Sequence, residues 1–120
     1  MTPVALAPVT VAVEVDVDPA DPVFAGHYPG FPILPGLFLV EHVNTAYRAH
    51  AVALGGPPVR PVALEKVRFL KPVYPGDRVR FDLTIEPVDG QFRCAAWASV
   101  DAERVAEIRL RYPDANGGAR

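Results

Sequence analysis

One helical segment constrains the fold of this sequence most, because its first turn is apolar on every side. The segment covers residues 37–54 and lies between a Pro-Gly pair and a Gly-Gly pair. Proline just before the first turn and glycine just after the last turn are typical of helix ends. Residues 37–40 are all apolar, so we expect this turn to be buried all round, as in the centre of a small domain.

Strands are predicted on both sides of this helix. Residues 9–18 read VTVAVEVDVD, and strict alternation of the β-branched residue valine with other residues is typical of a strand. After Pro61 four more strands are predicted, over residues 62–73, 78–86, 91–100 and 104–112. We expect these four to form an antiparallel meander, in which the small side chains Cys94, Ala96 and Ala98 let the helix pack closely.

Together these elements predict the α+β fold class, in a hotdog-like layout with one central helix wrapped by a curved antiparallel sheet of about five strands. The length of 120 residues fits a single domain over 1–120. One sheet covers only one side of such a helix, so a second subunit is expected to cover the rest.

Composition excludes several broad classes of protein. Half of the residues are hydrophobic and 22% are charged, which is typical of a globular chain. The single cysteine cannot form an internal disulfide, and no apolar run approaches the roughly 18 residues of a membrane span. No positively charged start of a signal peptide is present, and the net charge is −2. We therefore expect a cytoplasmic protein that binds neither membrane nor nucleic acid.

Most catalytic and metal-binding motifs are missing from the sequence. There is no CxxC or HExxH pattern and the three histidines lack ligand spacing, so no metal site is expected. Ser99, the only serine, lies within a predicted strand instead of a nucleophile elbow. Cys94 lies on an apolar strand face, where a small core residue is a better interpretation than a nucleophile. His42 and His50 have ordinary helix-surface explanations.

One pair of residues remains that can catalyse a reaction, His27 and Glu41. His27 lies in a Gly/Pro-rich loop before the helix, and Glu41 is the one acid in the apolar N-terminal half of the helix. An imidazole and a carboxyl in apolar surroundings form a general base and general acid pair. The backbone N–H groups of Gly36 and Leu37 can bond an anionic oxygen at the helix N-terminus. Spacing alone leaves open a loop histidine and a helix acid that are satisfied by backbone or water.

The segment that contains this pair, DPVFAGHYPGFPILPGLFLVEHV, resembles the active-site segment of the FabZ/FabA family of 3-hydroxyacyl-(acyl-carrier-protein) dehydratases. His27, Gly36 and Glu41 match the catalytic histidine, oxyanion-hole glycine and helix acid of that family. Glutamate at position 41 resembles the FabZ branch, which dehydrates, more than the FabA branch, which also isomerises. VRFLKPVYPGDRVRFDL resembles a second segment of the family, and the similarity covers about residues 9–112.

The resemblance implies a hotdog homodimer, or a heterodimer with another hotdog subunit, in which His27 of one protomer faces Glu41 of the other. The substrate is then a 3-hydroxyacyl chain on the phosphopantetheine arm of an acyl carrier protein, in fatty-acid or type II polyketide or polyene biosynthesis. His27 removes the α-proton and Glu41 acts on the departing 3-hydroxyl, while amides of the first helical turn bind the thioester oxygen. The product is a trans-2-enoyl thioester, and no cofactor is required.

The sequence departs from the family in two places. Family members usually begin with an extra helix and strand, for which we expect no counterpart in this sequence, and the helix continues HVNTAY where FabZ typically has AMAQ. Both departures favour a specialised polyketide or polyene pathway, beside a partner subunit. Two alternatives stay open: a hotdog acyl thioesterase in which Glu41 activates water, and a non-catalytic hotdog subunit that supports an active dehydratase.

Positive charge is concentrated after residue 47, and acyl carrier proteins are acidic. Five basic residues fall on or between adjacent predicted strands and are expected to form a docking site for the carrier protein: Lys66, Arg68, Lys71, Arg78 and Arg80. The alternative is a solvated sheet face, since Asp82 and Glu86 on the same face partly neutralise the charge.

Overall fold

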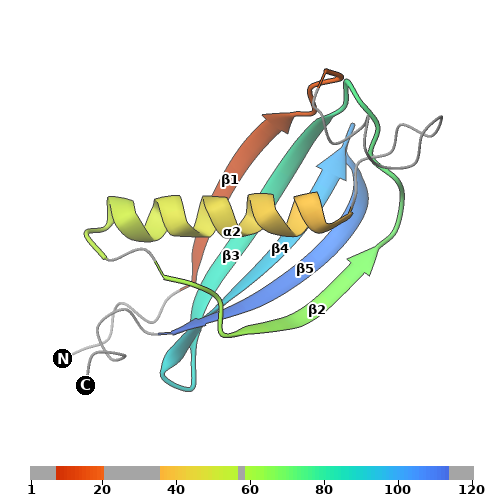
Figure 1. The fold of residues 1–120 in the computed structure, drawn as a ribbon. Coiled ribbons are helices and arrows are strands. Elements are labelled where there is room, and N and C mark those ends of the chain that lie inside the picture. Colours follow the sequence, from red (N-terminus) through yellow and green to blue (C-terminus); the bar gives the residue numbers. More distant parts are fainter. Residues whose placement is uncertain (1–7, 21–35, 57–58, 114–120) are drawn as a thin grey trace.

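The computed structural model describes residues 8–20, 36–56 and 59–113. Within these ranges the strands are β1 (Val9–Asp16), β2 (Ala63–Phe69), β3 (Arg78–Val88), β4 (Gln91–Val100) and β5 (Glu103–Pro113), and the helix is α2 (Gly36–Ala53). The strands form one antiparallel sheet, and α2 lies across one face of it (Figure 1). The predicted fold class, one helix against a five-stranded antiparallel sheet, is confirmed.

The strand order differs from the prediction at one strand. The sheet runs β1-β3-β4-β5-β2, so β3, β4 and β5 form a meander while β2 pairs with β5 at the far edge. The predicted four-strand meander is therefore wrong, because the strand expected over 62–73 is not part of it. That strand also ends earlier than expected, at Phe69.

Residues 70–77 explain this order, because they link the two edges of the sheet. At one end the amide of Leu70 donates to the carbonyl of Val105 in β5, at 2.8 Å. At the other end the amide of Val17, just after β1, donates to the carbonyl of Asp77, also at 2.8 Å. Strands that pair as a hairpin are joined by only about two to five residues. The longer link instead crosses the end of the sheet, and β3 begins beside β1.

The core lies between α2 and the sheet. The helix turns Leu39, Val43 and Tyr47 towards the sheet, at the i, i+4, i+8 spacing of one helical face. The facing side chains of β4 are small and buried, as predicted: Cys94, Ala96 and Ala98. Larger buried side chains of β3 and β5 fill the remaining space: Phe81, Leu83, Ile108, Leu110 and Tyr112.

The first turn of α2 is covered on one side only. Leu39 is 3% exposed, but Leu37 is 67% exposed. The prediction that this turn is buried on every side is therefore wrong for the single chain, because one sheet reaches only one face of a helix. Of the helices in the described ranges, none has the length and apolar character needed to cross a membrane.

Candidate active site

Three of the predicted site residues lie on the first two turns of α2. Gly36 is the first residue of the helix, Leu37 follows it, and Glu41 lies little more than one turn further along. Amides in a first helical turn have no carbonyl partner within the helix, and the helix dipole adds positive potential at the same place. This end of α2 can therefore bind an oxygen that carries negative charge.

Glu41 points away from the sheet of its own chain. Leu39 and Val43 face the sheet, and because each residue turns the helix by about 100°, the residue midway between them lies on the opposite face. Its side chain is exposed, whereas the sequence led us to expect a carboxyl in apolar surroundings. The reason is that the single sheet does not reach this face of the helix.

His27, the predicted general base, lies outside the described residues. How its imidazole is placed relative to Glu41 and to the start of α2 stays a prediction. The structure therefore places the predicted acid and the predicted oxyanion residues on the first two turns of one helix, and the role of the histidine stays a prediction from the sequence.

Gly36 is required by a close approach of Phe69, the last residue of β2. An ideal Cβ added at position 36 would lie 2.5 Å from Cζ and 2.7 Å from both Cε atoms of the Phe69 ring. A larger residue would have to displace either the ring or the helix end. Sequence reasoning identified Gly36 as a site residue but missed this reason for it, because the contact joins two elements that are distant along the chain.

A pocket of about 280 Å³ opens beside this contact. Its described lining comes from the start of α2 and from the end of β2 with the residues that follow it: Gly36, Leu39, Phe69, Leu70, Lys71, Pro72 and Val73. Sequence reasoning missed Phe69 and Leu70 as site residues. The available signal was the VRFLKPV stretch, which lies in the second family-like segment.

Two other candidate groups are explained by their surroundings. The His42 ring lies 6.1 Å from the ring of Phe38 and 5.8 Å from that of Phe81, the latter in the sheet. His42 is therefore half-buried between helix and sheet and is not the plain surface residue that we expected. Cys94 is fully buried, and burial raises the pKa of its thiol to about 12. The thiol stays protonated at neutral pH, as a core residue rather than a nucleophile.

Tyr112 of β5 ties the middle of α2 to the sheet. Its hydroxyl donates to Oδ1 of Asn44 at 2.8 Å, and its ring stacks on Tyr47 with centroids 3.6 Å apart. Burial raises the pKa of Tyr112, so the hydroxyl keeps the proton that it donates. These contacts fix the rotation of α2 about its own axis, which turns Gly36 towards the sheet and Glu41 away from it.

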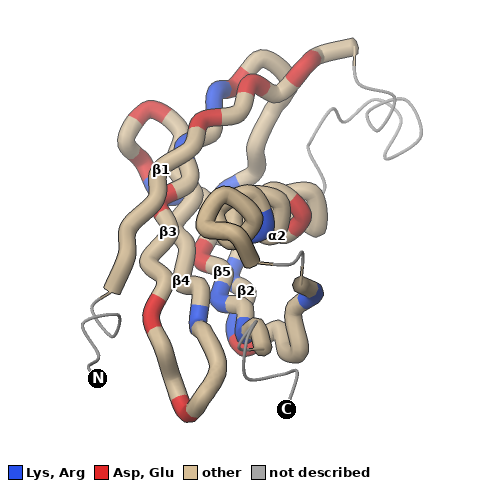
Figure 2. Tube along the Cα trace, turned by 90° about the vertical axis from the view of Figure 1, so that its left-hand side faces the viewer, with Lys and Arg blue, Asp and Glu red and all other residues tan. Residues whose placement is uncertain are grey.

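The five basic residues predicted to dock a carrier protein do not lie on adjacent strands. Lys66, Arg68 and Lys71 belong to β2 and the link after it. Arg78 and Arg80 lie on β3. β4 and β5 separate these two strands, and Figure 2 shows β1 and β3 on one side of the sheet and β2 on the other. The expectation of adjacent strands is wrong, because β2 and β3 follow each other in sequence but not in the sheet.

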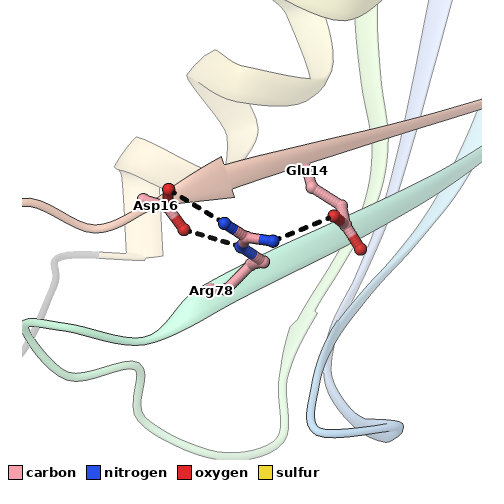
Figure 3. A network of polar contacts seen from close by, with 3 residues as sticks. All are labelled: Glu14, Asp16 and Arg78. Carbon is pink, nitrogen blue, oxygen red and sulfur yellow. Dashed lines mark hydrogen bonds and ion pairs between the residues drawn. The ribbon is translucent and has the colours of Figure 1, made fainter.

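Each of these cations also has a carboxylate partner. Glu107 lies 3.3 Å from Lys66 and 3.5 Å from Arg68. The other cations are paired in the same way: Lys71 with Glu103, Arg78 with Asp16 and Glu14 (Figure 3), and Arg80 with Asp82. Exposed pairs of this kind favour the alternative interpretation, a solvated sheet face whose charges neutralise each other.

Comparison with known sequences identifies the family. Residues 6–108 match the family model described as ApeI-like, ApeI dehydratase. A 3-hydroxyacyl-(acyl-carrier-protein) dehydratase FabZ from Rhizobium rhizogenes strain K84 is 39% identical over 96 residues. That alignment covers 75% of this chain and 60% of the relative, so the chain spans less than two thirds of the relative's length.

Solved structures share the fold. The dehydratase heterocomplex ApeI:P from Xenorhabdus doucetiae is similar with a TM-score of 0.68 and 19% identity, over 94% of this chain and 99% of that one. A mutant of the fluoroacetyl-CoA-specific thioesterase FlK is similar with a TM-score of 0.71 and 15% identity, over 88% and 84% of the two chains. At these identities the structures confirm the hotdog fold alone. The family model and the FabZ relative go further, and the chain belongs to the ApeI-like family of dehydratases, of the FabZ/FabA type.

Proposed function

We propose that this chain dehydrates a 3-hydroxyacyl thioester on an acyl carrier protein to a trans-2-enoyl thioester. One observation carries the proposal: the first two turns of α2 hold Gly36, Leu37 and Glu41, and Gly36 at the start of the helix lines a pocket. Membership of a dehydratase family, and a FabZ relative at 39% identity, support the same chemistry.

The reaction needs a base at the α-carbon, a place for negative charge on the thioester oxygen and an acid at the 3-hydroxyl. In the proposed mechanism His27 takes the α-proton. The thioester oxygen then accepts hydrogen bonds from the first-turn amides, which stabilise developing negative charge more than a neutral carbonyl. Glu41 gives its proton to the 3-hydroxyl, which leaves as water. The thioester itself acidifies the α-proton, so no step calls for a cofactor.

We further propose that two subunits share this site, with His27 of one protomer facing Glu41 of the partner subunit. The exposed face of the first turns of α2 supports this arrangement, since Leu37 and Glu41 both lie uncovered there. β2 supports it as well, because Leu64 is 55% exposed on this edge strand of the sheet. Exposed apolar side chains on an edge strand favour association with another chain. That chain is a second copy or another subunit of the same fold.

Intact-mass analysis of the carrier protein tests the activity. The chain is incubated with a carrier loaded with a 3-hydroxyacyl group, and loss of one water from the loaded carrier is expected, with no loss in an enzyme-free control. Release of the unloaded carrier together with a free acid would identify a thioesterase. An unchanged carrier mass would contradict catalysis by this chain and favour a supporting subunit.

A further inference from the structure

We infer that Phe69 determines which acyl chains the active site accepts, an inference that rests on the proposed dehydration. Phe69 lies where β2 ends, and its ring faces the first residue of α2. The ring therefore stands beside the amides proposed to hold the thioester oxygen. The acyl chain of a bound substrate begins at the carbon that carries this oxygen, so it must pass close to the ring.

The position of the ring is fixed from two sides. The ring packs so closely on the backbone of Gly36 that a Cβ there would lie 2.5–2.7 Å from three ring atoms. The chain immediately after Phe69 is anchored to β5, because the amides of Leu70 and Lys71 both donate to the carbonyl of Val105, at 2.8 and 3.2 Å. A ring held in this way limits the pocket on one side at a fixed position.

The ring is also available to a ligand, because the core uses only part of it. Phe69 is 53% exposed, whereas Leu39 and Val73, which line the same pocket, are 3% and 1% exposed. The pocket thus combines buried aliphatic side chains with one exposed aromatic ring. Replacement of that ring by a small side chain would enlarge the pocket at the place closest to Gly36.

The lining selects an alkyl chain over a polar group. Apart from Lys71, whose ammonium is paired with Glu103, the described side chains around the pocket are apolar. The volume of about 280 Å³ lies just below the roughly 300–1,000 Å³ of pockets that hold drug-sized ligands, so it fits a short chain. In a hydrophobic pocket one methylene group changes kcat/KM by about 10–200-fold. A phenyl ring is larger than a methylene group, so the Phe69 ring is sufficient to set a preference for chain length.

Two substrates of different length test the inference. 3-Hydroxybutyryl and 3-hydroxydecanoyl groups are loaded on the same carrier protein, and kcat/KM is measured for the unmodified chain, Phe69→Ala and Tyr74→Ala. Tyr74 is a matched control, because it is a 48% exposed aromatic residue in the link after β2 and is not part of the described pocket lining. Phe69→Ala should raise the long-to-short ratio of kcat/KM by about 10-fold or more, and Tyr74→Ala should leave it within about twofold.

The outcomes separate the inference from the function on which it rests. An unmodified chain that dehydrates the substrates, together with an unchanged ratio in Phe69→Ala, overturns the role of Phe69 and leaves the proposed function standing. If the unmodified chain dehydrates neither substrate, the proposed function is wrong, and the inference that rests on it is wrong as well. If Phe69→Ala does not fold, Phe69→Leu keeps an apolar side chain, and the ratio is again the readout.

Discussion

The two edge strands of the sheet, β1 and β2, expose different side chains. On β1, Glu14 and Asp16 pair with Arg78 of the neighbouring strand (Figure 3). On β2, Leu64 and Phe69 are more than half exposed, although their ladder partners in β5 are buried and they share the sheet face that α2 covers. Charged side chains protect an edge against pairing with another chain, whereas apolar ones favour it.

The candidate active site lies on the β2 side of the molecule. Gly36 contacts Phe69 at the end of β2, and the residues after that strand line the pocket. Substitutions on the β2 side are therefore expected to change assembly or catalysis. Substitutions on the β1 side are expected to leave both nearly intact.

The largest effect is expected from the two proposed catalytic side chains. His27→Ala and Glu41→Gln should each lower the rate of dehydration by about 10²–10³-fold, since each removes a group that transfers a proton. Glu14→Gln is the matched control on β1, because it neutralises an exposed carboxylate on the other side of the sheet. Steady-state kinetics with a carrier-bound substrate measure all three variants. Near-normal turnover of either catalytic variant would show that the pair is assigned wrongly.

A charge at the β2 edge should separate the subunits. Leu64→Lys places an ammonium among the exposed apolar side chains of β2, so we expect a monomer of 13.0 kDa by light scattering and a loss of dehydration with it. Val9→Lys introduces the same charge on β1, at a valine that is 42% exposed, and should leave the mass of the assembly unchanged. If Leu64→Lys keeps the mass of the unmodified chain, β2 is not the interface.

Overpacking at the start of α2 should have a smaller effect than these changes. The loss of stability should still be measurable by urea unfolding. Gly36→Ala is expected to lower the free energy of unfolding by about 1–3 kcal/mol, because the new methyl group meets the Phe69 ring. The same substitution in a Phe69→Ala background should cost much less, since the ring is gone. Equal costs in the two backgrounds would refute the contact.

The smallest effect is expected at the β1 edge. Hydrogen bonding and charge attraction from Arg78 hold the pKa of Asp16 below its ordinary value, so this pair adds stability at neutral pH and loses it as pH falls through that lowered pKa. Arg78→Ala should therefore lower Tm slightly at pH 7. The difference from the unmodified chain should narrow as pH falls past the ordinary aspartate pKa of about 3.9. A difference in Tm that does not depend on pH would exclude this ion pair as its cause.

Local patterns were sufficient to predict the elements of this fold. The alternation in residues 9–18 and the Pro-Gly and Gly-Gly pairs around the helix are properties of neighbouring residues, and they placed β1 and α2 within about two residues of their observed ends. The place of β2 in the sheet depends instead on how residues 70–77 cross the end of the sheet. No periodicity within β2 or β3 encodes that path.

The candidate site was predictable to the same extent. Gly36 and Glu41 could be found from their spacing along one helix, and the resemblance to a family gave them roles. The partnership of Gly36 with Phe69 could not be found, because it depends on two elements that meet only in the folded sheet. The exposure of Glu41 could not be found either, since it depends on which face of α2 the sheet covers.

Mixing two inactive variants tests the shared site most directly. His27→Ala and Glu41→Gln chains are unfolded together, refolded and assayed for dehydration of a carrier-bound substrate. If His27 of one protomer works with Glu41 of the partner subunit, random pairing gives mixed dimers with one intact site, and about a quarter of the unmodified activity should return. If the mixture stays as inactive as each variant alone, the two residues do not act across a subunit interface, and the proposed arrangement is wrong.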